Sequence, residues 1–386
     1  MKTTGDQQLV KRINRSALLR LLRAQPGLSR AQLASESGLT KSTVSLLVRE
    51  LIDEGWLAED EIAVTPGQGR PSTPLRLSNT VLGLVGVEVA VDCLRLVCVS
   101  LTGEVLWCTD EPLVSKRLED VCEQTARLTA QAQQAQSGLG LALFGIGVGL
   151  PGACDNATGR VRFAPNLGWR NVDFLSNLKR SLARYGLPDV PLHIQNDADA
   201  AALGEYEFAG GHDEDTLIFV NCDIGVGAGI VLNDRLFTGA QGMAGEIGHS
   251  IMQIDGELCS CGRRGCAETF IGARALAHGI GQTDRMIRAG HSLGVLLQNL
   301  WTTFNPNVLV AGGTSCVRHP ELVHLAQETL NACAANAGIA APQVRTARYG
   351  LLAPAVGAAA LVLHQHLRPV PTRLHQVPSV PRSLLA

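Results

Sequence analysis

The chain is short of aromatic residues, of charged residues and of long apolar runs. Aromatic residues occupy 4% of its 386 positions and charged residues 18%, against 46% for apolar residues. No apolar run reaches the roughly 18 residues that a membrane-spanning helix needs, and the opening segment MKTTGDQQLVKR lacks the apolar stretch of a secretory signal. Without export, the 11 cysteines are expected to stay reduced. The sequence therefore predicts a cytoplasmic protein without a membrane partner.

The hydrophobic core has to be built from aliphatic side chains, because few rings are present to fill it. Glycine is frequent, at 41 residues, and suits tight turns between strands and helices. Apolar segments such as 143–150 and 216–220 alternate with helical segments such as 118–136, 198–209, 267–279 and 287–303. Two successive sets of this alternation predict an α/β body of two lobes with a cleft between them.

Three helices are predicted near the N-terminus, over about 8–24, 30–37 and 40–54. A strand pair with a turn near 65–71 should follow, which is the order of a winged helix-turn-helix. A plain three-helix bundle is the alternative, but the polar residues that open the third helix favour DNA reading. The residues expected to read DNA are Lys41, Ser42, Thr43, Ser45 and Arg49, with Arg70 in the wing. A solvated turn residue explains Arg70 equally well.

The charge distribution agrees with a DNA-binding N-terminus. Residues 1–50 hold nine Lys and Arg but only three acids, a net charge of +6, which leaves −8 on the rest of the chain. A basic end on an acidic body suggests contact with a polyanion. A charge run can equally be a solvated face, so this observation supports DNA binding only together with the helix pattern.

Three cysteines and one histidine lie close together in the segment 249–266. Cys259, Cys261 and Cys266 stand among glycines, and His249 precedes them. Three thiolates and an imidazole can form a closed zinc site that leaves no position for water. We therefore predict one structural Zn²⁺ per chain, bound by these four residues. A chance group of buried cysteines or a redox pair are the alternatives, but Cys-x-Cys is not the Cys-x-x-Cys spacing of redox motifs.

Five segments resemble motifs of the ROK family, which groups sugar-responsive repressors and sugar kinases. They are 149–152, 164–168, 196–205, 244–249 and 259–268. The resemblance extends over nearly the whole chain, from residue 8 to about 365. It implies a two-lobe, actin-like (ribonuclease H-like) domain that binds a sugar in its cleft. The N-terminal winged helix is similar to that of the repressor branch, which includes regulators of xylose, glucose and N-acetylglucosamine genes.

This resemblance suggests three parts. Residues 1–78 would form the winged helix-turn-helix domain and residues 79–367 the sugar-binding ROK domain. The Pro-rich segment 368–386 is expected to be a disordered tail.

The resemblance also implies a set of sugar contacts. They are Asn166, Asn196, Asp197, Glu246, His249 and Glu268. Sugar hydroxyls both donate and accept hydrogen bonds, so carboxylates and amides can pair with them. His249 would bind zinc through one ring nitrogen and leave the other for the sugar or a carboxylate. Surface solvation is the alternative for Glu246 and Glu268, but their places beside the zinc motif favour the sugar site.

The retained Asp197 raises the question of kinase activity, because it matches the general base of the family's kinases. The phosphate loops do not match. Where those kinases have Asp-x-Gly-Gly-Thr-Lys, this chain reads Glu-Val-Ala-Val-Asp-Cys over 88–93, and the second loop opens with Asp223-Ile224. Carboxylates repel a triphosphate. Gly312-Gly313 is retained, but a glycine pair after a strand is weak evidence, so we expect sugar binding without catalysis.

Together these features predict a DNA-binding transcriptional repressor that a monosaccharide releases from its operator. Xylose, glucose and N-acetylglucosamine are the effectors that the resemblance suggests. We expect a homodimer or larger homo-oligomer on double-stranded operator DNA, because one winged helix reads too few base pairs for specificity. Two alternatives are an ATP-dependent sugar kinase with a fused DNA-binding domain and a sugar-binding scaffold whose winged helix contacts only proteins. The basic N-terminus disfavours the scaffold.

Overall fold

The computed structural model describes residues 7–60, 73–208, 216–240, 242–277 and 282–368. Arg70 and the expected disordered tail lie outside these ranges, so their roles remain predictions. Within the described ranges, no helix is both long enough and apolar enough to cross a membrane.

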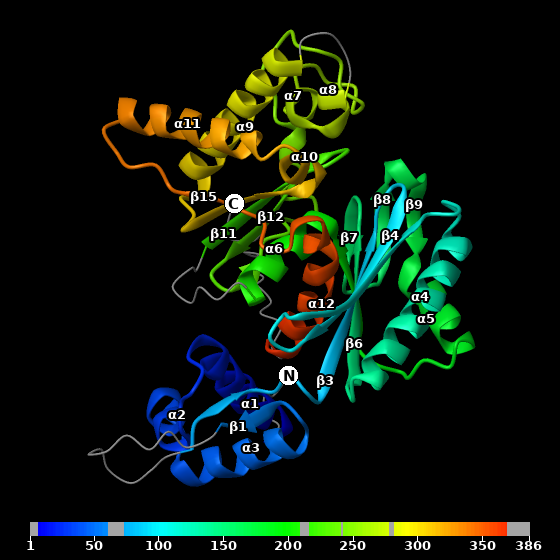
Figure 1. Ribbon diagram of the computed structural model, residues 1–386, viewed down its shortest axis with the longest axis vertical. Helices are drawn as coiled ribbons and strands as arrows, with labels where there is room; N and C mark the ends of the chain where they lie inside the picture. Colours follow the sequence, from blue (N-terminus) through cyan, green and yellow to red (C-terminus); the bar gives the residue numbers. More distant parts are fainter. Residues whose placement is uncertain (1–6, 61–72, 209–215, 241, 278–281, 369–386) are drawn as a thin grey trace, which may run out of the picture. The chain divides into compact units, whose positions relative to one another are not determined.

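Contacts within the chain divide it into two compact units. One contains Met1–Arg76 and His364–Ala386, and the other contains Leu77–Leu363. The described residues His364 to Arg368 thus group with the N-terminal unit, which the sequence did not suggest. Figure 1 labels the helices and many of the strands of both units.

The first unit has the elements of a winged helix-turn-helix. They are α1 (Gln7–Ala24), α2 (Arg30–Ser37), α3 (Lys41–Asp53), β1 (Leu57–Glu59) and β2 (Leu75–Leu77). The two strands pair in a small sheet. Leu18, Leu33, Val44 and Leu51 are completely buried, so the apolar faces of the three helices form the core of this unit.

Local capping explains where α2 and α3 begin. Ser29 and Gln32 form a capping box at the start of α2, in which each side chain accepts the other's backbone N–H. Gly38 ends α2 in the left-handed conformation, with φ of 69°, which glycine adopts without strain. Thr40 then caps α3 by accepting the Thr43 N–H. Short-range signals therefore define the turn that positions α3.

The first lobe of the second unit is built on a sheet of strand order β10-β6-β3-β4-β5. Its strands are β3 (Leu82–Val89), β4 (Cys93–Ser100), β5 (Val105–Pro112), β6 (Ala142–Leu150) and β10 (Leu192–Asn196). The first three pair antiparallel, whereas β6 and β10 extend the sheet in parallel. Helices α4 (Leu118–Gly138) and α5 (Phe174–Arg184) pack together on this lobe.

A second, three-stranded sheet of this lobe was not predicted from the sequence. It consists of β7 (Ala153–Asp155), β8 (Arg160–Ala164) and β9 (Trp169–Asp173), followed by α5. The 3₁₀ turn η1 (Pro165–Leu167) connects β8 and β9. These strands have only three to five residues, too few for apolar alternation to identify them.

The second lobe is built on a sheet of strand order β13-β12-β11-β14-β15. Its strands are β11 (Thr216–Cys222), β12 (Val226–Leu232), β13 (Arg235–Leu236), β14 (Val308–Gly312) and β15 (Val344–Thr346). The helices of this lobe include α9 (Gln282–Phe304), α10 (Gly313–Arg318) and α11 (Glu321–Asn336). The long helices α9 and α11 pack against each other and share one apolar core with the sheet.

Two helices of this lobe differ from the prediction. The helix expected over 267–279 is broken into α7 (Glu268–Ile271) and α8 (Ala273–Ala277), because Gly272 adopts an extended conformation between them. The helix expected over 287–303 begins five residues earlier, at Gln282.

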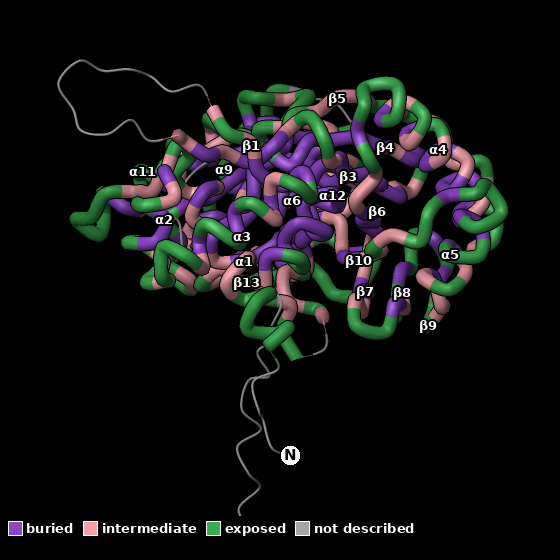
Figure 2. Tube along the Cα trace, turned by 90° about the horizontal axis from the view of Figure 1, so that it is seen from below, coloured by how far each residue is buried: buried purple, intermediate pink, exposed green. Residues whose placement is uncertain are grey.

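Two helices that pack within the second unit are largely buried. They are α6 (Asp197–Phe208) and α12 (Ala353–His366), which follows the turn η3 (Gly350–Leu352). Figure 2 shows both helices largely in the colour of buried residues. α12 was not predicted, because it is rich in alanine and apolar on all sides, and such a helix has no amphipathic period.

Candidate functional site

The four predicted zinc ligands lie together in the second lobe. Their ligand atoms are all within 4.8 Å of one another. His249 Nδ1 lies 3.6 Å from Cys259 Sγ, and Cys261 Sγ lies 3.7 Å from Cys266 Sγ. A tetrahedral ion with Zn–S bonds of about 2.3 Å separates its sulfur ligands by about 3.8 Å. The spacing therefore fits a Zn²⁺ ion and is far too long for a disulfide bond of about 2.05 Å.

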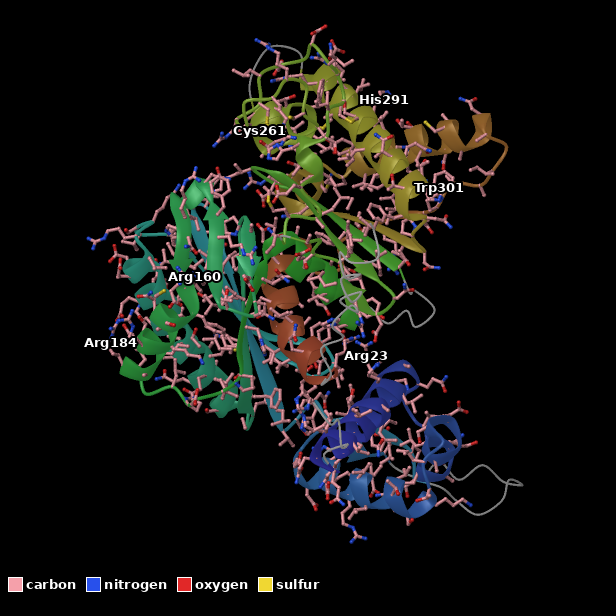
Figure 3. The ribbon with its side chains drawn as sticks, turned by 180° about the vertical axis from the view of Figure 1, so that it is seen from behind. Arg23, Arg160, Arg184, Cys261, His291 and Trp301 are labelled. Carbon is pink, nitrogen blue, oxygen red and sulfur yellow. The ribbon has the colours of Figure 1, made fainter. Side chains whose placement is uncertain are left out.

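The backbone around this cluster explains its glycines. His249 ends the short turn η2 (Ile247–His249), and the three cysteines follow in a loop held by isolated pairings such as Ile251 with Cys266. Gly265 has φ of 67°, and a Cβ at this position would lie 1.6 Å from the Gln253 carbonyl oxygen. Only glycine fits there. Figure 3 shows Cys261 in the second lobe, in the upper part of that view.

Glu268 connects the cysteine loop to the second phosphate-like loop. Its carboxylate accepts hydrogen bonds from the Ser260 hydroxyl, at 3.3 Å, and from the Val226 N–H, also at 3.3 Å. Cys259 Sγ lies 3.9 Å from the same carboxylate. The position of Glu268 therefore depends on the order of the loop that carries the cysteines.

Asn196 and Asp197 lie where β10 passes into α6. The Asn196 side chain accepts the N–H groups of Ala198 and Asp199, at 2.9 and 3.1 Å, and donates to the Gly152 carbonyl at 3.1 Å. Asn196 thus caps α6 and joins it to the loop after β6. A residue with this role holds Asp197 in place, whether or not it also contacts a ligand.

A group of carboxylates surrounds Asp197. Burial raises the pKa of Asp197 to about 7, and the negative charges of Asp223 and Glu246 add to this effect. Burial also raises the pKa of Glu246, with Glu268 adding to the shift and His249 opposing it. Asp199, which the sequence analysis missed, has its pKa raised well above the ordinary value by burial and by the two neighbouring acids Asp197 and Glu246. Its place two residues after Asp197 was the available signal.

The predicted sugar-contact residues therefore interact with one another, with the exception of Asn166. The pKa of Asp197 responds to Glu246, that of Glu246 responds to Glu268 and His249, and His249 lies in the cysteine cluster. Asn166, in η1, is exposed, and it is its backbone carbonyl that accepts a bond of 2.9 Å from the Lys116 ammonium. Convergent donors and acceptors of this kind suit a ligand that carries several hydroxyl groups.

The predicted DNA-reading residues lie on α3. Lys41, Ser42, Ser45 and Arg49 are exposed and recur at helical spacing along one side of the helix. Thr43 is only partly exposed, and its hydroxyl lies 2.8 Å from that of Thr40 in the cap. Thr43 therefore contributes to the start of α3 more directly than to its outer surface. Leu46 is 56% exposed on the same helix and was not predicted as a contact.

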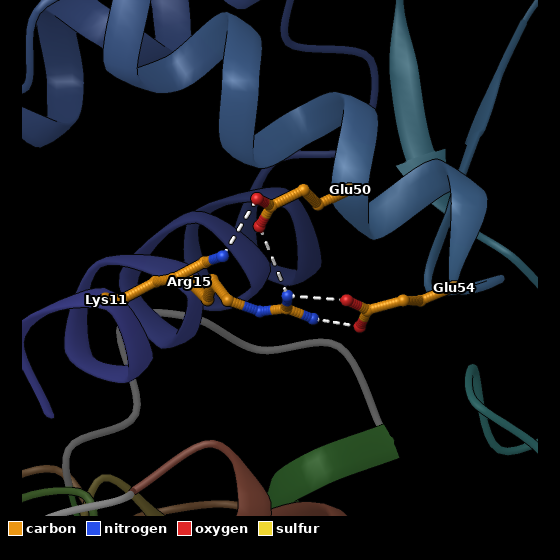
Figure 4. Close-up of polar contacts among 4 residues, drawn as sticks. All are labelled: Lys11, Arg15, Glu50 and Glu54. Carbon is orange, nitrogen blue, oxygen red and sulfur yellow. Dashed lines mark hydrogen bonds and ion pairs between the residues drawn. The ribbon is translucent and has the colours of Figure 1, made fainter. Parts of the chain in front are cut away.

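Glu50 of α3 and Glu54, which follows the helix, are paired with basic residues of α1, as Figure 4 shows. Lys11 lies 2.8 Å from Glu50, and Arg15 contacts both Glu50 and Glu54. These pairs offset the negative charge at the end of α3, so that Lys41 and Arg49 present a net positive surface. That arrangement favours an anionic partner.

Comparison with known proteins agrees with both units. The model of the ROK family matches residues 84–365, and a model of winged helix-turn-helix DNA-binding domains matches residues 11–58. A putative xylose repressor of Caldicellulosiruptor sp. (strain Rt8B.4) is 32% identical over 345 residues, which cover 80% of this chain and 84% of that protein. The xylose repressor of Bacillus subtilis (strain 168) is 28% identical and covers 94% of this chain and 98% of its own length.

Two solved structures share the fold. A ROK family transcriptional regulator, described as a homologue of the Escherichia coli MLC protein, has a TM-score of 0.73 at 22% identity, covering 93% of this chain and 98% of that chain. A ROK family glucokinase from Streptomyces griseus, in complex with glucose and AMPPNP, has a TM-score of 0.60 at 25% identity and covers 72% of this chain and 98% of that chain. With a family model that spans most of its length and relatives that match both of its units, the chain belongs to the ROK family.

Proposed function

We propose that this protein is a transcriptional repressor that leaves its operator when a monosaccharide binds. The observation that carries the proposal is the presence, in one chain, of a winged helix with a basic outer surface and of the converging polar set around Asp197. Relatives that match along most of the chain are named xylose repressors, and the N-acetylglucosamine repressor of Escherichia coli O157:H7 is 29% identical over 273 residues. Xylose is therefore the first effector to test.

The proposed roles rest on the geometry for the residues of α3 and for the carboxylates, and on the sequence alone for Arg70 and Asn166. Lys41, Ser42, Ser45 and Arg49 would contact DNA, while Thr43 would mainly position α3 and Arg70 would act from the wing. In the sugar site, the carboxylates of Asp197, Glu246 and Glu268 would accept hydrogen bonds from sugar hydroxyl groups. Asn196 and Asn166 would support these contacts. His249 presents Nδ1 to Cys259, which leaves Nε2 for the sugar.

We further propose that the cysteine cluster binds one structural zinc ion per chain. His249 and the three cysteines would hold it and leave no open position, so that the ion would supply order to the loop rather than chemistry. Because Ser260 and Cys259 lie beside Glu268, an ordered loop would keep that carboxylate in place for the sugar.

We propose that the protein does not phosphorylate its sugar. In the first phosphate-like loop, Glu88 lies 3.0 Å from Arg95, which also lies 3.1 Å from Asp110. The Glu88 and Arg95 side chains are only 5% and 14% exposed, so this pair is largely buried between the strand ends of β3 and β4 that flank the loop. In the second loop, Asp223 accepts a bond of 3.1 Å from the Thr314 hydroxyl at the start of α10. Carboxylates belonging to the protein thus use donors that a nucleotide phosphate would need.

A homodimer is proposed for DNA binding, because two half-sites supply the base pairs that one winged helix cannot read. As a regulator of chromosomal genes, the protein would act in the cytoplasm. The alternative of a sugar kinase with a fused DNA-binding domain is tested by incubating the protein with ATP and each sugar in a coupled assay. Turnover near the roughly 1–100 s⁻¹ of kinases that is lost in Asp197→Asn would support the kinase and contradict our proposal.

The repressor proposal is tested by fluorescence anisotropy of operator DNA selected from a random library with the purified protein. We expect xylose, glucose or N-acetylglucosamine to weaken binding of the wild-type protein. Arg49→Ala should reduce operator binding and leave sugar binding intact, whereas Glu246→Ala should do the reverse. Arg117→Ala, which removes a 77% exposed charge from the other unit, is the control and should change neither. No response of the wild-type protein to any of the sugars would contradict the proposal.

A further inference from the structure

Helix α12 packs backbone to backbone within the second unit. A Cβ added to Gly357, in the middle of α12, would lie 1.9 Å from the Ala200 carbonyl oxygen of α6. A Cβ on Gly86 of β3 or Gly147 of β6 would lie 1.9 or 1.7 Å from a carbonyl oxygen of α12. Contacts this close contain no flexible side chains that could absorb a displacement. A movement of α6 must therefore move α12.

The start of α6 is part of the candidate sugar site. Asp197 is its first residue, and a Cβ on Gly149 would lie 3.6 Å from the Asp197 Cα atom and 3.5 Å from the Pro354 carbonyl oxygen of α12. The end of β6, the first turn of α6 and the first turn of α12 thus meet at one glycine. A displacement of Asp197 on ligand binding would therefore be transmitted directly to the first turn of α12.

The other end of α12 belongs to the winged-helix unit. The His366 ring stacks on the Trp56 ring, with centroids 4.5 Å apart and planes 7° from parallel. The Ser16 hydroxyl of α1 donates to the Leu367 carbonyl oxygen, and Leu367 is 1% exposed. Trp56 is itself fixed to α3, because its backbone N–H donates to the Leu51 carbonyl oxygen at 2.8 Å. The C-terminal end of α12 therefore contacts the residue that directly follows the DNA-reading helix and its turn.

From these contacts we infer that α12 couples the sugar site to the DNA-reading helix, and that the His366–Trp56 stack is its point of attachment. The inference rests on the proposed function. One continuous helix of 14 residues contacts α6 in its N-terminal part and Trp56 at its C-terminal end, so we expect a ligand-dependent change at α6 to alter the contacts of Trp56, which follows α3. Sugar binding can lower operator affinity by this route only if the ligand favours the shifted position. His366, Trp56 and Gly357 are positioning residues and contact neither ligand.

The test compares His366→Ala, which removes the stack, with His366→Phe, which keeps an aromatic ring on Trp56. For each protein, operator affinity is measured without and with saturating xylose, or with glucose or N-acetylglucosamine if one of these gives the larger wild-type response. Sugar affinity is measured separately by titration calorimetry. Allosteric effects typically amount to about 5- to 150-fold. We expect the sugar effect on operator affinity to shrink at least about threefold in His366→Ala and to recover in His366→Phe, with sugar affinity unchanged.

Ser16→Ala, which removes only the bond to Leu367, is a second variant and should also reduce the sugar effect if His366→Ala fails to fold. Phe237→Ala is the matched control, because it removes a ring contact to Phe304 in the second lobe and leaves α12 untouched. A full sugar effect in His366→Ala or, failing its folding, in Ser16→Ala would overturn the role of α12 while leaving the repressor proposal intact. Absence of any sugar effect in the wild-type protein would instead contradict the proposed function, and the inference with it.

Discussion

At the scale of single residues, the site depends on side chains that serve two partners. His249 directs Nδ1 to Cys259 and has a second ring nitrogen free for a ligand. Glu268 accepts from Ser260 of the cysteine loop and from Val226 of β12. Because His249 belongs to the cysteine cluster and Glu268 contacts its loop, we expect a change in the cluster to alter ligand binding.

The first prediction concerns the metal. Protein purified without added zinc should contain about one zinc per chain, and Cys266→Ser should lose it, because a site with three thiolates is broken when one is removed. Sugar affinity should fall in this variant, since the loop beside Glu268 loses its order. Cys108→Ser, at an exposed free cysteine of β5, should keep both metal and affinity. Elemental analysis and calorimetry check this, and a zinc-free wild-type protein with normal sugar binding would contradict it.

The second prediction concerns pH. Burial and nearby carboxylates raise the pKa of Asp197 to about 7, so Asp197 loses its proton on passing from pH 6 to pH 8. An ionised carboxylate accepts the sugar hydroxyl bond more strongly than a protonated one. Sugar affinity should therefore be highest above pH 7 and fall by up to about tenfold for each pH unit below it. Calorimetric titrations at several pH values check this, and Asp197→Asn should bind weakly and lack the Asp197-dependent change.

At the scale of elements, glycine decides how closely α12 approaches its neighbours. Gly86, Gly147 and Gly357 each lie where a Cβ would overlap a backbone carbonyl. These positions fix the distance between the sheet of the first lobe, α12 and α6. Glycine in helix interiors is otherwise unfavourable relative to alanine, so the close approach explains why Gly357 lies in the middle of α12.

The third prediction tests this close approach. Gly357→Ala should lower the free energy of unfolding by at least about 1–3 kcal/mol, because the new methyl group must displace the backbone of α6. The matched change Gly138→Ala lies at the end of α4, where nothing is within 4 Å of the added Cβ, and should be neutral or stabilising by up to about 1 kcal/mol. Urea unfolding of both variants measures the difference. Equal stabilities would show that α12 can move away from α6 without cost.

The sequence predicted correctly those elements whose limits are set by residues close to them in the chain. Ser29, Gly38 and Thr40 mark the limits of α2 and α3, and the cysteine spacing indicated a His/Cys cluster, whose four ligand atoms the structure brings together. The helix α12 could not be recognised in this way, because its contacts with β3, β6 and α6 come from segments more than 100 residues away. Asp199 and the Glu88–Arg95 pair were missed for a related reason. Asp199 is buried by the packing of α6, and the Glu88–Arg95 pair follows from the register of β3 and β4, which places the two residues opposite each other.

At the scale of the whole molecule, the chain combines two units with different tasks and different charge. The first 50 residues carry +6 and the remainder −8, so DNA attracts one part of the molecule and repels the other. Operator affinity should therefore depend steeply on salt, in proportion to the number of phosphate contacts. Sugar binding, which involves a neutral ligand, should depend on salt only weakly.

The last prediction follows from linkage between the two ligands. If a sugar lowers operator affinity by some factor, operator DNA must lower sugar affinity by the same factor, because both describe one coupling free energy. We expect this factor to lie near the roughly 5- to 150-fold range of allosteric proteins. Sugar titrations with and without saturating operator, compared with operator titrations with and without saturating sugar, measure it twice. Arg49→Ala is the control, because it binds little DNA at concentrations that saturate the wild-type protein. At these concentrations, DNA should leave the sugar titration of this variant unchanged. Unequal factors in the wild-type protein would mean that the sugar and the operator do not act on a single equilibrium, and competition at one site or a change of oligomeric state would then have to explain release.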